Sequence, residues 1–130
     1  MKNILIVGCG LIGSSLVRAI SHKKIAKKIY VYEKSKYNIS KIKRLRLNCE
    51  IISDFKKITP NLDLIILCTP ISEYQKIISK MNKYLLPKTI ITDVGSTKVN
   101  VNFVIKQKLK KGISWTSSHP IAGSEVSGPE

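Results

Sequence analysis

The residues with the clearest chemical signature are three glycines near the start of the chain. Gly8, Gly10 and Gly13 form the pattern G-x-G-x-x-G, with Leu11 and Ile12 before the last glycine. Between a strand and a helix, such a turn lets a pyrophosphate meet the N–H groups at the helix N-terminus. Gly8 would permit the tight turn, Gly10 the approach of the phosphates, and Gly13 close packing of the helix on the sheet. The motif predicts a dinucleotide site that includes Leu11 and Ile12.

A carboxylate at the expected spacing supports this interpretation. Glu33 lies 20 residues after Gly13 (33 − 13), directly after a second apolar run. There it would accept hydrogen bonds from the adenosine ribose hydroxyls and repel a 2′-phosphate, so NAD is favoured over NADP. Lys34 and Lys36 follow at once and would offset part of that repulsion. The alternative is a glycine turn with an incidental surface glutamate.

Polar residues also follow two later apolar runs. Thr69 and Pro70 end the run 62–68, and Pro70 would stop the strand. Thr69 either presents its hydroxyl or backbone to the cofactor or belongs to a simple terminating turn. Ser96 follows the run 89–94, where it can cap the next helix through its hydroxyl, face the cofactor, or do both.

His119 is the candidate general base. It follows the last predicted strand, at the edge where open α/β sheets bind ligands, and histidine titrates near neutral pH. The alternative is an exposed or structural histidine. The other histidine, His22, ends the first predicted helix, where the helix dipole favours positive charge. Two histidines without a cluster of cysteines or aspartates predict no metal site.

The elements that must position these residues alternate between strand and helix. Short runs rich in isoleucine and valine predict strands buried on both faces, and apolar residues spaced three and four apart predict amphipathic helices. Right-handed crossovers then give an α/β fold with a doubly wound, mostly parallel, Rossmann-like sheet. The expected strands are 2–7, 28–32, 50–53, 62–68, 89–94 and 113–116, and the expected helices are 11–21, 40–47, 72–85 and 98–110.

Length and composition limit the classes of protein to which the chain can belong. The chain has 130 residues, the size of one domain, and 43% of them are hydrophobic, enough for a core. No apolar run reaches the roughly 18–20 residues of a membrane span. The glycine motif stands where a signal peptide would have its cleavage site, so no export is expected. The three cysteines lack metal or disulfide spacing and are expected as reduced thiols in the cytoplasm.

The net charge of +15 raises the alternative of nucleic-acid binding. Only Arg18, Arg44 and Arg46 are arginines, and the other basic residues are lysines, whose four adjacent pairs lie at predicted helix ends and loops. Readers of bases favour arginine, and single-strand binders interleave aromatic residues with basic ones. A solvated basic surface is therefore favoured over a nucleic-acid face, and it could steer anionic small molecules toward the site.

These stretches together resemble the prephenate/arogenate dehydrogenase family of tyrosine biosynthesis: VGCGLIGSSLVRAI, VYEK, DLIILCTPI, TDVGSTK and, most specifically, SHPIAGSEVSG. The resemblance implies an NAD-dependent enzyme that oxidatively decarboxylates prephenate or arogenate, with hydride transfer to nicotinamide. It implies that His119 is the base, that Ser96 orients the histidine and the substrate, and that Thr69 lies near the nicotinamide. The cofactor positions match Gly8, Gly10, Gly13 and Glu33.

The resemblance covers only the N-terminal, cofactor-binding part of the family. Family members continue into a helical C-terminal domain that makes the dimer and supplies an arginine for a substrate carboxylate. We therefore expect residues 1–130 to be a dinucleotide-binding domain that is incomplete at its C-terminal end and lacks the helical domain. Two alternatives follow: a subunit that needs a complementary helical chain for activity, or a truncated, non-catalytic NAD-binding remnant.

Overall fold

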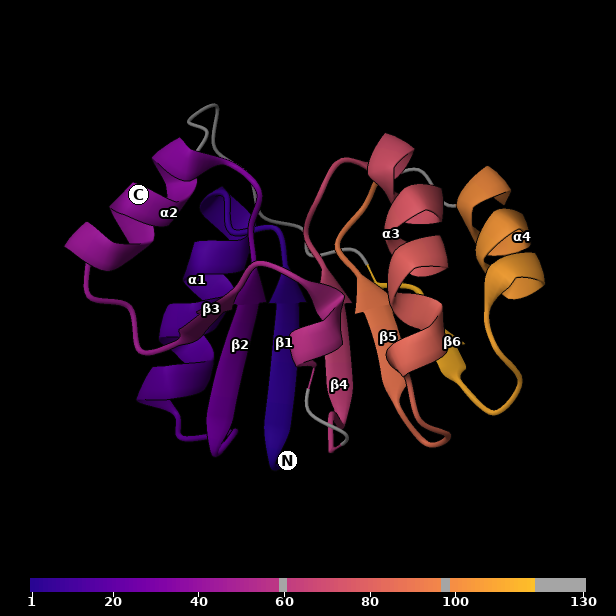
Figure 1. Cartoon of the computed structure of the whole chain (residues 1–130), viewed down its shortest axis with the longest axis horizontal. Helices are drawn as coiled ribbons and strands as arrows, with labels where there is room; N and C mark the ends of the chain where they lie inside the picture. Colours follow the sequence, from indigo (N-terminus) through magenta and orange to yellow (C-terminus); the bar gives the residue numbers. More distant parts are fainter. Residues whose placement is uncertain (59–60, 97–98, 119–130) are drawn as a thin grey trace.

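The computed structural model describes residues 1–58, 61–96 and 99–118 (Figure 1). In these residues six strands form one sheet in the order β3-β2-β1-β4-β5-β6, and each neighbouring pair is parallel. This order is that of doubly wound dinucleotide-binding folds, in which the chain returns to the middle of the sheet after the third strand. The predicted fold class is confirmed.

The boundaries follow the predicted ones closely, apart from the helices discussed next. The strands are β1 (Asn3–Val7), β2 (Lys28–Tyr32), β3 (Glu50–Ile52), β4 (Leu64–Leu67), β5 (Ile90–Asp93) and β6 (Ser114–Thr116). The helices are α1 (Leu11–His22), α2 (Lys36–Arg44), α3 (Tyr74–Met81) and α4 (Val99–Lys108), and short 3₁₀ turns are η1 (Phe55–Lys57), η2 (Ile71–Glu73) and η3 (Asn82–Tyr84).

Two helix predictions were wrong in detail. The helix expected over 40–47 begins at Lys36, because Ser35 is its N-cap and accepts a hydrogen bond from the Asn38 N–H at 3.3 Å. Apolar periodicity starts only at Ile39, so it places this helix too far along the chain. The helix expected over 72–85 is three pieces: η2 leads into α3, and η3 follows it.

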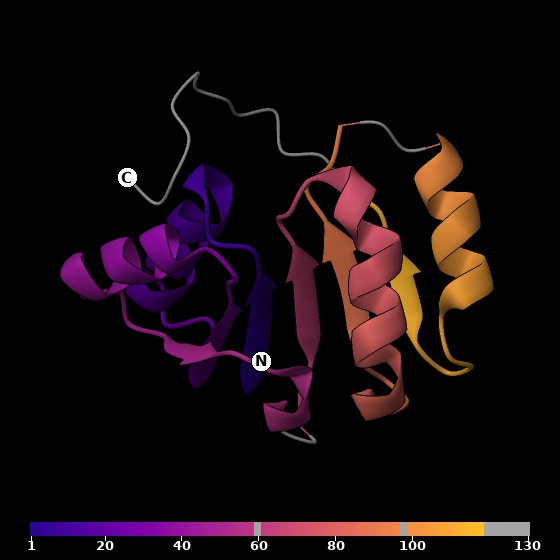
Figure 2. The ribbon, with the colours of Figure 1, turned by 45° about the horizontal axis from the view of Figure 1, so that its top comes forward.

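Each face of the sheet has its own core because side chains alternate along a strand. On β1, Ile4 and Ile6 face the cluster that includes Val17 of α1 and Ile42 of α2. Leu5, the residue between them, faces the cluster built with α3 and α4. Figures 1 and 2 show the same division, with α1 on one side of the sheet and α3 and α4 on the other. Every helix thus has a sheet face to cover.

Parallel pairing brings the carboxyl ends of the strands to one edge. Hydrogen bonds continue past the strand ends there: the Gly8 N–H donates to the Tyr32 carbonyl at 2.8 Å, and the Cys68 N–H donates to the Val7 carbonyl at 2.8 Å. The segments after β1, β2 and β4 therefore leave the sheet side by side. This edge carries most of the residues that the sequence singled out.

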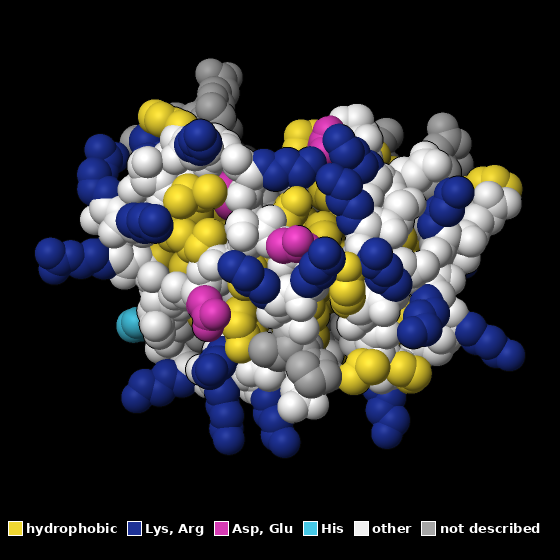
Figure 3. All heavy atoms as spheres, viewed as in Figure 1, with side chains coloured by type: hydrophobic (Ala, Val, Ile, Leu, Met, Phe, Trp, Pro, Cys, Tyr) yellow, Lys and Arg dark blue, Asp and Glu magenta, His cyan; other side chains and the backbone are white. Residues whose placement is uncertain are grey.

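Basic residues occur in all four helices and in most loops of the chain, so they do not gather on one element. Figure 3 shows lysine and arginine side chains across the whole of the face that it presents, with few acidic ones among them. Among the described residues, no helix has the length and apolar character that crossing a membrane requires. The expectation that nucleic acid is not the partner stays a prediction.

The three cysteine thiols, of which Cys9 is buried and Cys49 and Cys68 are half-buried, give a first testable prediction. Burial raises the pKa of Cys9 and of Cys68 to about 12, and that of Cys49 to about 11, from an ordinary value of 9.0. We expect all three thiols to be alkylated far more slowly in the folded protein than in denaturant at pH 8, because the thiolate is the reactive form. Folded stability should fall as the pH rises from about 9 toward 12, because the unfolded chain loses these protons first. Alkylation kinetics and thermal melts test this; equal alkylation rates in the two states would contradict it.

Candidate dinucleotide-binding site

The three glycines of the first turn have the geometry that their predicted tasks require. Gly8 has a φ of +90°, and a Cβ on it would lie 2.7 Å from Cγ2 of Thr69. A Cβ on Gly13 would lie 2.2 Å from the carbonyl oxygen of Gly8, so α1 can start this close to β1 only without a side chain there. A Cβ on Gly10 would meet no atom of the described residues within 4 Å. The turn is therefore closed on two sides and open at Gly10.

The start of α1 is suited to an anion. Gly10 is its N-cap and provides no side-chain hydrogen bond, and the first turn contains no acidic residue. The first N–H groups of a helix lack carbonyl partners within it and lie at its positive end. Leu11 and Ile12 open this helix, so their N–H groups are among these donors. A pyrophosphate would find room and donors here.

The carboxylate of Glu33 connects the end of β2 to the glycine turn. Its Oε2 accepts the Cys9 N–H at 2.8 Å and the Asn38 side-chain amide at 3.2 Å. Its Oε1 accepts the N–H groups of Lys34 at 2.8 Å and of Ser35 at 2.9 Å. Three of the four donors are backbone groups of two loops, so the carboxylate holds both loops in one arrangement. The residue that the spacing from Gly13 singles out, Glu33, thus bonds directly to the glycine turn.

A cavity of about 510 Å³ lies beside this carboxylate, and four of the predicted residues line it: Gly8, Glu33, Thr69 and Pro70. Within the described residues, the hydroxyl of Thr69 is buried and has no hydrogen-bond partner. Buried polar atoms in folded proteins almost always have a partner, which a ligand or an ordered water in the adjoining cavity can supply. The donors, the acceptor and the unsatisfied hydroxyl together fit a dinucleotide.

A second carboxylate, that of Asp93, orders the loops after β5 and β6. Asp93 is fully buried, and its Oδ2 accepts the Tyr74 hydroxyl at 3.1 Å and the Gly95 N–H at 3.0 Å. Its Oδ1 accepts the Ser118 N–H at 3.3 Å, and the Ser118 hydroxyl donates to the backbone carbonyl of Asp93. Burial, reinforced by the Asp93 charge, raises the pKa of Tyr74 far above its usual value. One carboxylate thus joins α3, the turn before α4 and the segment after β6.

The predicted catalytic residues are less well defined. Ser96 is exposed and follows Gly95 in the turn that Asp93 holds, but it does not line the cavity. His119 lies outside the described residues, directly after Ser118. Among the described residues no group of three histidine, cysteine or acidic side chains could hold a metal ion.

The serines after the glycine motif do not contribute hydroxyl groups to the open side of the turn. The sequence suggests that Ser14 or Ser15 adds a hydroxyl to a phosphate site. Both hydroxyls donate back to the Leu11 carbonyl, at 3.0 Å and 2.9 Å, and Ser14 is fully buried. Their bonds satisfy a carbonyl of the first helical turn.

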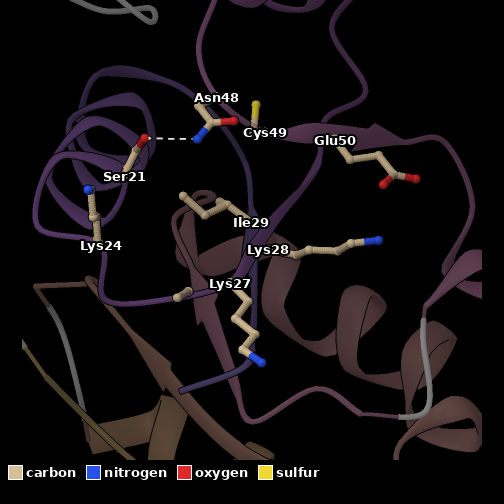
Figure 4. Close-up of a pocket in the computed structure, with 9 residues that line it drawn as sticks. Ser21, Lys24, Lys27, Lys28, Ile29, Asn48, Cys49 and Glu50 are labelled. Atoms are coloured by element: carbon tan, nitrogen blue, oxygen red, sulfur yellow. Dashed lines mark hydrogen bonds between the residues drawn. The ribbon is translucent and has the colours of Figure 1, made fainter.

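Another cavity, of about 420 Å³, lies at the amino ends of β2 and β3 (Figure 4). The Asn48 amide donates to the Ser21 hydroxyl at 3.1 Å on its rim. The ammonium groups of Lys24, Lys27 and Lys28 point in different directions, so they do not converge on one anion. Ligands of open α/β sheets bind at the carboxyl ends of the strands, and this cavity is at the opposite edge.

Sequence reasoning missed several residues that shape the site. Asn38 supports Glu33, Tyr74 supports Asp93, and Glu73 lines the cavity from η2. The Ser35–Asn38 spacing is a helix-start signal that could have placed Asn38 near Glu33. For Tyr74 and Glu73 no local signal exists, because their partners lie 19 and 39 residues away along the chain.

The fold and this edge define an α/β nucleotide-binding domain of the dehydrogenase type. The family model described as "Prephenate dehydrogenase, nucleotide-binding domain" matches residues 16–130, and the chain belongs to this family. A cyclohexadienyl dehydrogenase from Zymomonas mobilis is 33% identical over 99% of this chain and 44% of its own length. A prephenate dehydrogenase from Lactococcus lactis is 32% identical over 98% of this chain and 36% of its own length.

Solved structures of prephenate and arogenate dehydrogenases have the same fold as this chain. The prephenate dehydrogenase from A. aeolicus, in complex with hydroxyphenyl propionate and NAD⁺, superposes with a TM-score of 0.87 at 30% identity, over 99% of this chain and 45% of that one. The Synechocystis arogenate dehydrogenase gives a TM-score of 0.85 at 26% identity, over 98% of this chain and 44% of that one. The chain thus spans less than half the length of the relatives it matches.

The close approach at Gly13 gives a prediction on stability. In Gly13→Ala the new methyl group must displace the Gly8 carbonyl, so we expect a loss of about 1–3 kcal/mol in the free energy of unfolding, as in other overpacked sites. Gly10→Ala is the matched control, because its methyl group meets no described atom within 4 Å, and it should cost clearly less. Chemical denaturation measures both; equal losses would contradict the packing role of Gly13.

Proposed function

We propose that this chain binds NAD at the carboxyl edge of its sheet and forms the cofactor-binding part of a prephenate or arogenate dehydrogenase. The observation that carries the proposal is the cavity that Gly8, Glu33 and Thr69 share beside the open start of α1. Family membership and the likeness to a relative solved with NAD⁺ support it. In such an enzyme the bound nicotinamide accepts a hydride from the substrate.

The proposed cofactor contacts assign each part of the dinucleotide to residues at the carboxyl edge of the sheet. The turn with Gly8, Gly10 and Gly13 and the first N–H groups of α1, those of Leu11 and Ile12, would hold the pyrophosphate. Glu33 would accept hydrogen bonds from the adenosine ribose and disfavour a 2′-phosphate, so NAD is preferred to NADP. Thr69 and Pro70 would border the nicotinamide side, with the Thr69 hydroxyl gaining the partner it lacks among the described residues.

The proposed reaction uses the loops after β5 and β6. His119 would accept the proton of the substrate's C4 hydroxyl as hydride leaves the same carbon, and the ring would then lose CO₂ and become aromatic. Ser96 would orient the histidine and the substrate. Support comes from Asp93, which binds the N–H groups of both Gly95 and Ser118, the residues directly before Ser96 and His119 in the chain.

The proposed substrate site needs more than residues 1–130. We propose that this dinucleotide-binding domain is incomplete at its C-terminal end and that a helical domain, on a complementary chain or a continuation, completes the substrate site in the cytoplasm. The relatives are more than twice as long as the part that this chain matches, which supports this view. The alternative is a non-catalytic NAD-binding remnant.

Cofactor binding is the first test of the proposal. We expect NAD to bind the purified chain, and Gly10→Val or Glu33→Lys to weaken binding by about tenfold or more, because each removes the room or the acceptor that the cofactor requires. Glu50→Lys makes the same charge reversal at the amino end of β3 and should leave the affinity unchanged. Isothermal titration calorimetry measures this; folded wild-type protein that binds no NAD would refute the proposal.

Catalysis is tested by supplying the missing domain. Fused to the C-terminal part of the Zymomonas mobilis relative, residues 1–130 should reduce NAD in the presence of prephenate or arogenate. His119→Asn in the fusion should lower the rate by about 10²–10⁴-fold, the usual contribution of a general base, with NAD affinity unchanged. NADH absorbance reports the rate. A fully active His119→Asn fusion would exclude His119 as the base, and NAD binding without turnover would favour the remnant.

A further inference from the structure

We propose that Glu73 is a specificity-determining residue at the adenosine end of the cavity. By pairing with Lys34 it withholds a lysine of the cavity from a 2′-phosphate, and it thereby adds to the preference of the chain for NAD over NADP. The inference rests on the proposed function, because it assumes that a dinucleotide occupies the cavity. It concerns a residue that neither the glycine motif nor the spacing to Glu33 identifies.

The pair connects two loops on opposite sides of the cavity. Lys34 follows β2, and Glu73 is the last residue of η2, which follows β4. Their charged groups meet across the opening, with Nζ of Lys34 3.3 Å from Oε2 of Glu73. Both residues line the cavity, and their side chains are 47% and 41% exposed. The ion pair therefore lies at the solvent side of the cavity, where an adenosine 2′-substituent would enter.

Lys34 donates hydrogen bonds to two carboxylates through two different groups. Its backbone N–H donates to Glu33, while its ammonium group donates to Glu73. The Glu33 carboxylate already accepts four hydrogen bonds, three of them from backbone groups. The Lys34 ammonium is thus paired with Glu73, whereas backbone and amide donors hold Glu33.

The charges around the cavity balance only because of Glu73. Glu33 and Glu73 oppose Lys34 and Lys76, which also lines the cavity. Without the Glu73 charge, two lysines would face one carboxylate, and the Lys34 ammonium would be available to an anion. A 2′-phosphate adds a charge of almost −2 at this position, whereas the 2′-hydroxyl of NAD adds none. Loss of Glu73 should therefore act on NADP and hardly on NAD.

The ion pair suits a test because it is exposed. Pairs of this kind contribute little to folded stability, so removing either partner should leave the fold intact. In Glu73→Gln we expect the Kd for NADP to fall roughly fivefold and the Kd for NAD to stay within about twofold. In the double variant Glu73→Gln/Lys34→Gln the gain should disappear, because no ammonium group is then released. The gain should also shrink at high salt, which screens exposed charges.

Two controls separate this effect from others. Glu50→Gln removes the same charge at the opposite edge of the sheet and reports the effect of net charge alone. Thermal melts of each variant report folding. Titration of the intact chain with NAD and with NADP then decides: a gain for NADP that depends on Lys34 supports the inference. An unchanged NADP affinity, an equal change for both cofactors, or a gain that survives in the double variant overturns it. Wild-type protein that binds neither cofactor overturns the proposed function as well.

Discussion

The contact between Gly13 and the Gly8 carbonyl is the constraint on which the rest of the site depends. With only a hydrogen on Gly13, α1 can begin within a few residues of the end of β1, and its unpartnered N–H groups face the edge of the sheet. The same closeness places the Cys9 N–H where Glu33 can accept it. A larger side chain at Gly13 would separate helix from strand, and the turn, the Glu33 contact and the cavity wall would change together.

Two carboxylates then order the loops that this constraint leaves at the edge. Glu33 gathers N–H groups from the glycine turn and from the loop before α2. Asp93 does the same for the turn after β5 and the segment after β6, with the Tyr74 hydroxyl as a third donor. Backbone N–H groups need acceptors wherever they leave the sheet, and a carboxylate can accept several at once. In both cases one carboxylate accepts the backbone N–H groups that have no partner strand after the sheet ends.

The sequence predicted the fold, and it singled out Glu33, which bonds to the glycine turn, because both depend on local patterns. Apolar runs, their spacing and the glycine motif are short-range signals, and Glu33 lies at a fixed distance along one βαβ unit. The start of α2 was misplaced because Ser35 capping, and not periodicity, decides it. Glu73, Tyr74 and Ser118 escaped prediction because their partners lie 39, 19 and 25 residues away along the chain and no sequence motif fixes these spacings. The role of His119 rests on family resemblance, since no local physical signal distinguishes a base from an exposed histidine.

The sheet order explains why the cavity lies where it does. The chain builds β1, β2 and β3 outward with α1 and α2 on one face, then returns beside β1 to build β4, β5 and β6 with α3 and α4 on the other. The loops after β1 and β4 therefore start side by side and run to helices on opposite faces, and a hollow opens between them, as at the switch point of other doubly wound sheets. Glu33 belongs to the first half and Asp93 to the second. The Lys34–Glu73 pair is an exposed charged contact between the two halves, and it belongs to neither core.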